Sequence, residues 1–480
     1  MNKTTKGFAW KLLERFGVAS AQFVLQIILA RLLAPEHYGA LSIMIIFTTL
    51  ANVFVQSGFN TALVQNKDVD EDDYSSVFWV SFIIALILYA VIFFASPLIG
   101  LFYNMPEIVT PMRVLGLMIL PGSLNSVQVA KISREMNFRK IFFSNIWGVL
   151  ISGIVGIVIA YNGGGLWALV AQSLLNVCVV CLVMRFTAKL KLRLICNLKR
   201  VKVLFGFGWK LLVSSLIDVL YHDLRSLVIG KKYNSGTLGY YNRGKQFPQF
   251  ITTAVNGAAQ SVLLPAMAEH QDDKSKVKEM TRNSIMLSAY ILFPMMAGLA
   301  AVATPLVSLL LTDKWLPCVP YLQIYCFTYA FWPIHTSNLQ AINAIGRSDI
   351  FLKLEVLKKS IGVAALVIAL LCFDTPLAIA MTGIITALIS SFINAFPNQK
   401  LIGYSYFEQM RDILPSLVLS AIMFAAVYAL NFLPIANIFI LIIQVIVGIV
   451  VYFAISFLVK FEPLKIIIET VKNTIKKKTV

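Results

Sequence analysis

The sequence predicts an all-α polytopic membrane protein with about 14 transmembrane helices, arranged as two pseudo-symmetric six-helix lobes followed by two extra C-terminal helices. Three observations lead to this fold class. Of the 480 residues, 58% are hydrophobic and only 13% are charged, whereas a typical soluble domain is about 25% charged. The chain contains a series of apolar segments that are long enough to cross a bilayer. It also repeats itself in parallel, about 200 residues further along.

The apolar segments set the number of expected helices. A hydrocarbon core about 30 Å thick requires roughly 20 helical residues. By this criterion the expected spans are 9–32, 39–61, 75–97, 110–130, 141–161, 165–185, 205–229, 240–266, 283–311, 319–345, 351–372, 376–396, 413–431 and 435–458. The runs are too long and continuous for the strands of a membrane barrel. Charges at Lys11, Glu14 and Arg15 interrupt the first span, so we expect a functional helix there and not a cleaved signal peptide.

The internal repeat sets the expected lobes. Residues 7–13 (GFAWKLL) return as residues 206–212 (GFGWKLL), and Arg31 and Gly39 find counterparts in Lys231 and Gly239. We therefore expect an N-terminal lobe over 1–200, a C-terminal lobe over 201–400, two additional helices over 401–460 and a basic amphipathic tail over 461–480. That tail should lie on an anionic leaflet, with a solvated tail as the alternative.

Polar positions inside the repeated segments also match. Thr49, Asn52, Gln56 and Asn60 correspond to Gln249, Thr252, Asn256 and Gln260. Their spacings of three and four place each set on one helical face. Two homologous lobes with facing polar stripes are a common way to build the central path of a secondary transporter. Pro121 and Pro333 match as well, and they indicate either hinges or kinks that only shape packing.

The net charge of +18 does not indicate nucleic-acid binding, because the basic residues follow membrane topology. They gather in the loops 131–140, 186–204 and 268–282, while the short loops 161–164, 374–376 and 431–434 contain no Lys or Arg. This positive-inside pattern predicts that both termini lie in the cytoplasm. The acidic loop 66–73 departs from the pattern, but acidic residues contribute little to orientation.

Charged residues within the predicted helices are the strongest functional signal, because a charge at the bilayer centre costs about 2.5–3.5 kcal/mol. One face of the first predicted helix carries Lys11, Arg15, Gln22 and Gln26. The corresponding face of the seventh helix carries Lys210, Ser214, Asp218, Tyr221 and Arg225, and His222 lies beside it. Arg243 and Lys245 lie at the start of the eighth helix. Snorkelling explains the residues near helix ends but not the deeper Asp218 and Arg225. A structural ion pair involving Asp218 or Asp223 is the other alternative. The excess of basic groups favours an anionic ligand such as phosphate or pyrophosphate.

Two short motifs do not carry the function. Cys178 and Cys181 form a C-x-x-C within an apolar span, where a metal or redox site would lack polar support, so we expect packing residues. Residues 239–245 read as G-x-x-x-x-G-K, but they follow no strand and end in Gln246 where a P-loop has Ser or Thr. We therefore expect no nucleotide, metal or other cofactor.

Several motifs in order resemble one family. They are Trp10-Lys11, residues 30–35 (ARLLAP) followed by Tyr38-Gly39, residues 76–79 (SVFW), residues 165–170 (GLWALV) and residues 238–243 (LGYYNR). Together they resemble the bacterial polysaccharide-transporter (Wzx-like) flippases, of the superfamily that includes multidrug and toxin extrusion antiporters and lipid II flippases. The resemblance implies a V-shaped fold and alternating-access transfer of an undecaprenyl-pyrophosphate-linked oligosaccharide to the periplasmic leaflet. It also implies contact with polysaccharide polymerase and export machinery.

In such flippases, basic residues of the first, second, seventh and eighth helices line a cationic cavity. Combined with the polar stripes, this gives a candidate substrate-binding set. Its members are Lys11, Arg15, Arg31, Asn52, Gln56, Lys210, Asp218, Arg225, Arg243 and Asn256. Expected partners are the lipid-linked oligosaccharide and anionic membrane lipids.

Three other functions compete with this interpretation. A cation-coupled multidrug antiporter of the same superfamily would need carboxylates in its cavity, where only Glu14, Asp218 and Asp223 qualify. A membrane glycosyltransferase or polymerase would need a larger aqueous loop than the chain offers. A scaffold protein would not need matched polar stripes. We therefore expect a transporter and not an enzyme.

Overall fold

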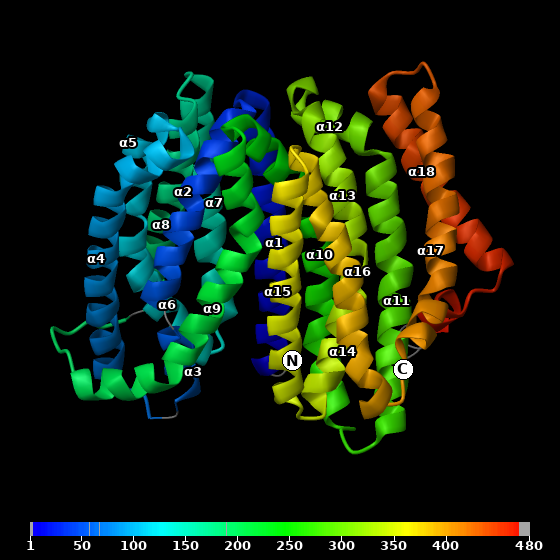
Figure 1. Ribbon diagram of the computed structural model, residues 1–480. Coiled ribbons are helices and arrows are strands. Elements are labelled where there is room, and N and C mark those ends of the chain that lie inside the picture. The colour runs from blue at the N-terminus through cyan, green and yellow to red at the C-terminus, as the bar shows by residue number, and fades with distance from the viewer. Residues whose placement is uncertain (1–2, 57, 67, 189, 470–480) are drawn as a thin grey trace. The chain divides into compact units, whose positions relative to one another are not determined.

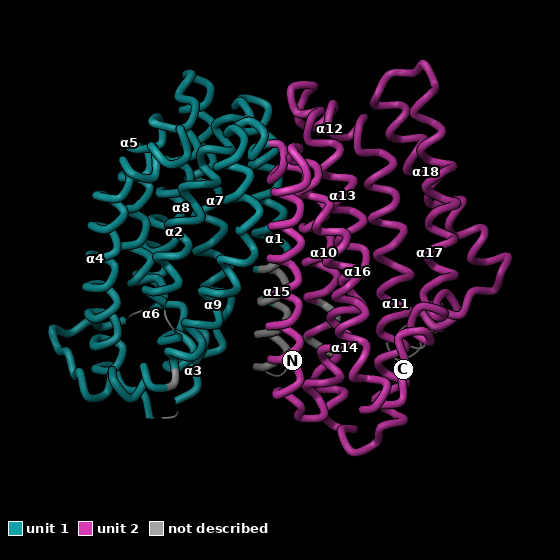
Figure 2. Tube along the Cα trace, in the orientation of Figure 1, with its two compact units in different colours: residues 1–239 teal, residues 240–480 magenta. Residues whose placement is uncertain are grey.

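A computed structural model describes residues 3–56, 58–66, 68–188 and 190–469, which form helices joined by short connections (Figure 1). No strand occurs among these residues, so the predicted all-α class is confirmed. The chain divides into two compact units, residues 1–239 and 240–480 (Figure 2). Each unit is described separately below.

Within its described residues, unit 1 contains ten complete helical elements. They are α1 (Lys3–Leu32), α2 (Pro35–Gln56), α3 (Phe59–Gln65), α4 (Glu71–Tyr103), η1 (Pro106–Ile108), α5 (Val109–Gly116), α6 (Ile119–Arg134), α7 (Phe138–Tyr161), α8 (Leu166–Ala188) and α9 (Leu198–Lys232). Helix α9, which opens the second sequence repeat, packs against α2, α3 and α4 of this unit. Compact packing and sequence repetition thus divide the chain differently, and the lobe boundaries expected from the repeat stay a prediction.

Unit 2 begins within α10 (Ser235–Ala268) and continues to the C-terminal segment. Its further elements are α11 (Lys274–Ala301), α12 (Ala303–Leu311), η2 (Asp313–Cys318), α13 (Val319–Ala330), α14 (Trp332–Ala344), α15 (Ser348–Cys372), α16 (Pro376–Leu401), α17 (Tyr406–Ala429), η3 (Leu430–Phe432) and α18 (Asn437–Leu458). Residues 462–469 form one more helical stretch. The rest of the predicted amphipathic tail, 470–480, lies outside the described residues.

Nine helical stretches of the described chain are long and apolar enough to cross a membrane, and α9 makes a tenth if its two arms count as one span. Helices α1, α10, α13–α14 and α15 do not meet that criterion. Two of them, α1 and α10, carry polar positions of the sequence analysis, as do α2 and α9. A multi-pass membrane protein is therefore supported. The count of 14 spans stays a prediction.

Several predicted spans are broken helices. The expected span 39–61 divides into α2 and α3, and Gly58 adopts a φ of 70° at the break. A Cβ on Gly58 would lie 2.5 Å from the Cα of Gly208 on α9, so only glycine permits this backbone-to-backbone contact. The two arms of α9 meet at 55° beside Gly208. These two interruptions therefore face each other inside unit 1.

The matched prolines also mark breaks. Pro121 is the third residue of α6, which follows α5 after a two-residue interruption, and Pro333 is the second residue of α14, which follows α13 after Phe331. Proline lacks the N–H that would continue a helix from the preceding turn. The expectation of matched kinks is therefore confirmed, while their use as hinges stays a prediction.

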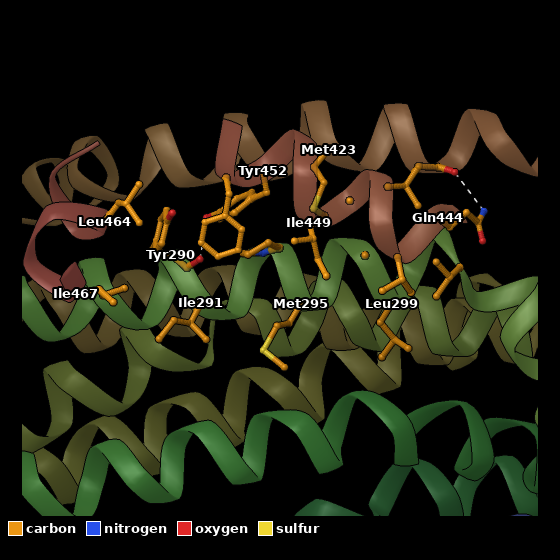
Figure 3. Close-up of a pocket in the computed structure, with 17 residues that line it drawn as sticks. Tyr290, Ile291, Met295, Leu299, Met423, Gln444, Ile449, Tyr452, Leu464 and Ile467 are labelled. Atoms are coloured by element: carbon orange, nitrogen blue, oxygen red, sulfur yellow. Dashed lines mark hydrogen bonds between the residues drawn. The ribbon is translucent and has the colours of Figure 1, made fainter. Parts of the chain in front are cut away.

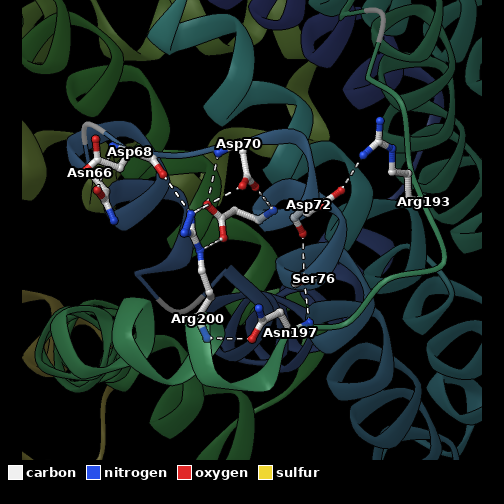
Figure 4. A network of polar contacts seen from close by, with 9 residues as sticks. Asn66, Asp68, Asp70, Asp72, Ser76, Arg193, Asn197 and Arg200 are labelled. Carbon is white, nitrogen blue, oxygen red and sulfur yellow. Dashed lines mark hydrogen bonds and ion pairs between the residues drawn. The ribbon is translucent and has the colours of Figure 1, made fainter.

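The connection between α8 and α9 is bound to the surface of unit 1 (Figure 4). The backbone N–H groups of Arg193 and Asn197 donate to the hydroxyls of Ser75 and Ser76 on α4, at 3.0 and 2.9 Å. Arg200 binds Asp73 through two nitrogens, at 2.7 and 3.0 Å. The acidic loop 66–73, which departs from the positive-inside pattern, therefore supplies carboxylates that pair with the basic connection between α8 and α9.

Helices α14, α16 and α17 of unit 2 are joined by a buried cluster of side-chain amides. The Nδ2 atom of Asn338 donates to Gln409 at 2.8 Å, and the Nε2 atom of Gln409 donates back to Asn338 at 3.0 Å. Asn398 donates to the same Oδ1 atom of Asn338 at 2.7 Å. All three residues are fully buried. Such a cluster fixes α17, the first of the two additional helices, to the rest of the unit.

Candidate functional site: a polar face on helix α9 and an apolar groove in unit 2

The polar residues of α9 form the longest candidate site in unit 1. Lys210, Ser214 and Asp218 are exposed, and Tyr221 and Arg225 are partly buried. Their spacings of three and four place them on one side of a regular helix. This face carries two cations, one carboxylate and two hydroxyls over about 22 Å of helix, at 1.5 Å per residue. Its basic groups suit an anionic group with hydrogen-bonding neighbours.

The other predicted residues of unit 1 have more varied surroundings. Arg31 is exposed at the end of α1, and Gln56 is exposed at the end of α2. The side chains of Lys11 and Arg15 lie outside the described residues. The stripe expected from Thr49 to Asn60 is not continuous, because the break at Gly58 intervenes. That part of the expectation was wrong, since the sequence does not show the contact with α9 that requires the break.

Asn52 lies where α2 packs against α6. A Cβ on Gly122 would be 2.9 Å from the Oδ1 atom of Asn52, so a glycine makes room for this amide. Among the described residues, the side-chain oxygens of Asn52, Asn125 and Gln128 are buried without a hydrogen-bond partner. Buried amides normally bind a polar group or water. Asn125 and Gln128 were not in the predicted site. They stand 212 residues before Ser337 and Gln340, as Pro121 stands before Pro333, and this match signals a polar position.

The two predicted residues of unit 2 are buried. Arg243 is only 4% exposed; its guanidinium carbon lies 5.2 Å from the ring centre of Trp315, and it donates to Gln246 at 2.6 Å. Asn256 is 5% exposed, and its Nδ2 atom has no partner among the described residues. In this conformation Arg243 and Asn256 are thus held by packing, unlike the exposed Lys210 and Asp218 of α9.

An apolar groove runs along unit 2 between α11, α17 and α18 (Figure 3). Its volume is about 460 Å³. Met295 and Leu299 line it from α11, Met423 from α17 and Ile449 from α18, and Leu464 and Ile467 of the C-terminal segment lie at one end. Its surface is almost wholly apolar, which suits an acyl or isoprenoid chain. Sequence analysis missed this groove, because it depends on how three helices splay apart.

The C-terminal segment is held at that end by charged contacts. Arg282 of α11 binds Asp412 of α17 at 2.9 Å and Glu462 at 3.5 Å. Tyr404 donates to Asp412 at 2.7 Å. These contacts place residues 464 and 467 beside the groove and keep the ends of α11 and α17 together.

The described residues contain no group of three or more His, Cys, Asp and Glu side chains placed to hold a metal ion. Cys181 is buried and Cys178 is partly buried within α8, and both are free thiols. They pack within the helix bundle of unit 1.

Comparison with known proteins gives a consistent picture. The family model described as "Polysaccharide biosynthesis protein" matches residues 28–320. The chain is 25% identical over 350 residues to the succinoglycan biosynthesis transport protein ExoT of Rhizobium meliloti, covering 72% of this chain and 70% of the relative. It is 24% identical over 430 residues to the lipopolysaccharide biosynthesis protein WzxC of Escherichia coli, covering 87% of each.

Solved structures agree on the fold. The lipid II flippase MurJ in an inward closed conformation aligns with a TM-score of 0.73 at 16% identity, covering 94% of this chain and 98% of that one. An inward-facing multidrug resistance transporter of the MATE family aligns with a TM-score of 0.61 at 16% identity, covering 81% and 98%.

Proposed function

The chain belongs to the polysaccharide biosynthesis protein family, and we propose that it is a flippase that carries an undecaprenyl-pyrophosphate-linked oligosaccharide across the inner membrane for surface polysaccharide assembly. The transfer proceeds from the cytoplasmic to the periplasmic leaflet by alternating access. The observation that carries the proposal is the polar face of α9, on which the exposed Lys210 and the partly buried Arg225 offer basic groups within a long apolar helix. The names of the relatives, a polysaccharide transport protein and a lipopolysaccharide biosynthesis protein, support the same class of cargo.

Each part of this cargo has a matching chemistry. The pyrophosphate requires N–H donors, for which Arg225, Lys210 and Arg31 are the candidates. Lys210 lies 15 residues from Arg225 on α9, about 22 Å at 1.5 Å per residue, so these two residues meet the pyrophosphate at different points of its path. The isoprenoid tail requires an apolar surface, which the groove between α11, α17 and α18 supplies. Side-chain amides and hydroxyls are the usual partners of sugar hydroxyls, so Asn52 and Gln56 are assigned to the glycan. Asp218 lies between Lys210 and Arg225 along the same face and is assigned to the same polar path.

The cation-coupled antiporter is the second candidate. It depends on carboxylates, and one of the three available, Glu14, accepts a hydrogen bond from Asn145 of α7 at 3.2 Å. That contact ties Glu14 to the packing of α1 on α7. The balance of basic over acidic groups on α9 therefore favours an anionic cargo.

Charge reversal on α9 tests the proposal. We expect Arg225→Glu to abolish transport while leaving the amount of protein in the membrane unchanged, because a carboxylate there repels pyrophosphate. The measurement is the lipid-linked oligosaccharide that accumulates in a deletion strain complemented with the variant. Lys191→Glu is the matched control, since Lys191 is an exposed cation in the connection between α8 and α9. Normal polymer production with Arg225→Glu would contradict the cationic-site assignment.

A further inference from the structure

One arginine of unit 1 lies outside the α9 face and has an unusual environment. Pro97 lies inside α4, and because proline has no N–H, the carbonyl oxygen of Phe93 loses its helical partner. Two side chains replace that partner. The hydroxyl of Ser96 donates to the Phe93 oxygen at 2.9 Å, and Nε of Arg113 on α5 donates to it at 3.2 Å. Arg113 is thereby anchored to α4 at the proline.

The anchoring fixes the whole guanidinium group. Nε of Arg113 also donates to the hydroxyl of Ser96 at 3.0 Å, and the guanidinium carbon lies 4.4 Å from the ring centre of Phe93. Ser96 is fully buried. A planar group held at one nitrogen and stacked on a ring keeps the direction of its other N–H bonds. Its two terminal nitrogens are therefore preorganised on the seam between α4 and α5.

Those terminal nitrogens are available. Arg113 forms no ion pair with any carboxylate of the described chain. Its terminal nitrogens are also not among the enclosed polar atoms of the described residues, so they reach the surface of the unit. The same turns of α4 carry exposed apolar side chains, since Phe94 and Leu98 are 75% and 70% exposed. An arginine at such a place requires a counter-anion from its surroundings.

The position of Arg113 along α4 identifies the leaflet. The start of α4 is at the basic end of unit 1, where Glu71 pairs with Lys131. Phe93 lies about 33 Å further along the helix axis at 1.5 Å per residue. Arg113 is therefore in the half of the membrane away from the basic loops, where the positive-inside rule makes an arginine uncommon. The matched position of the second repeat, eight residues before Pro333, holds Tyr325 and not a basic residue.

We propose that Arg113 binds the phosphate group of a membrane lipid in the leaflet opposite the basic loops. Two terminal nitrogens in a fixed fork match two oxygens of one phosphate. The exposed side chains of α4 next to the site accommodate the lipid chains. The phosphate belongs either to a phospholipid or to an isoprenoid lipid carrier, and these two sources share the chemistry that Arg113 recognises.

The test must separate lipid binding from the structural role of Arg113. Pro97→Ala restores the N–H that bonds the Phe93 carbonyl, so the helix no longer needs Arg113 there. The full-length protein, Pro97→Ala and Pro97→Ala/Arg113→Gln are purified, and their thermal unfolding is compared to show that all three are folded. Native mass spectrometry then measures the binding of phosphatidylglycerol, undecaprenyl phosphate and diacylglycerol. Arg347→Gln removes a charge that is already paired with Asp349 at 2.9 Å, and it serves as the control.

We expect Arg347→Gln to bind the two phosphate lipids like the unmodified protein. Pro97→Ala should bind them equally or slightly more weakly, because Arg113 loses the Phe93 carbonyl as an anchor but keeps its contacts with Ser96 and the Phe93 ring. The double variant should bind one equivalent on the order of tenfold more weakly than Pro97→Ala, and diacylglycerol should not compete. The phosphate lipid that binds more tightly shows whether Arg113 recognises a phospholipid or an isoprenoid carrier. Unchanged phosphate-lipid binding in the double variant, or equal binding of diacylglycerol, would overturn the proposal. Because the measurement involves no transport, its failure would leave the flippase assignment unaffected.

Discussion

Gly39 and Gly239, which the sequence repeat matches, pack reciprocally where α2 and α10 begin. A Cβ on Gly39 would lie 1.8 Å from the carbonyl oxygen of Ser235, and one on Gly239 would lie 2.1 Å from the carbonyl oxygen of Pro35. Pro35 and Ser235 are themselves a matched pair, since each stands four residues before its glycine. The starts of α2 and α10 therefore cross with backbone against backbone. The matched residues of the two repeats make the same contact in both directions.

This crossing predicts a strong effect of adding one methyl group. We expect Gly39→Ala and Gly239→Ala each to lower the unfolding temperature of the purified protein, because the backbones must separate to admit Cβ. The measurement is fluorescence-detected size-exclusion chromatography after heating. Gly298→Ala is the control, since its Cβ would meet only the end of the Met423 side chain at 3.7 Å. Equal thermal stability of all three variants would contradict the close contact.

Two native cysteines test the predicted topology. Cys196 is exposed in the basic connection between α8 and α9, and Cys372 is exposed at the end of α15, next to a short loop without basic residues. The charge pattern places the first in the cytoplasm and the second in the periplasm. An impermeant maleimide added to intact spheroplasts should label Cys372 and spare Cys196 until the membrane is permeabilised. Cys196→Ala and Cys372→Ala show which cysteine gives each signal. Rapid labelling of Cys196 in intact spheroplasts would contradict the predicted sidedness.

Alternating access predicts that the matched polar residues approach each other during transport. A crosslink between cysteines introduced at Gln56 and Asn256 should block transport, and a reductant should restore it, because the bond would tie the two repeats together. Transport is measured as polymer production in a background with Cys196 and Cys372 replaced by alanine. Each single cysteine variant is the control. If the pair never crosslinks and both positions react only with lipid-phase reagents, these residues do not line a path.

The buried amide cluster of unit 2 predicts an unequal effect of two adjacent substitutions. Asn398→Ala should lower the free energy of unfolding by about 1–3 kcal/mol, because it removes a donor to the shared Oδ1 atom of Asn338 inside the unit. Gln399→Ala should change it by less than about 0.5 kcal/mol, since Gln399 is exposed. Denaturant or thermal unfolding in one detergent measures both. A similar loss in the two variants would show that the cluster does not stabilise unit 2.

The sequence alone determined the helical membrane class, the internal repeat and the sidedness expected from its charges. A helix in a bilayer satisfies its backbone hydrogen bonds within its own segment, so local composition is enough to predict it. The polar face of α9 was predictable for the same reason, since Lys210, Asp218 and Arg225 share a face through helical spacing alone. The matched prolines likewise signalled the breaks before α6 and α14.

Only the tertiary structure decided where helices break without proline and which polar groups are buried. The break at Gly58 depends on Gly208, 150 residues away in the chain, and no local pattern records that contact. Arg243 was expected at an open site but is enclosed against Trp315, because α10 packs on α13 through Gly244. The anchoring of Arg113 depends on the carbonyl of Phe93 on α4, which has no helical N–H partner because Pro97 follows four residues later. These features arise from contacts between segments distant in sequence, and such contacts exist only once the helices have packed.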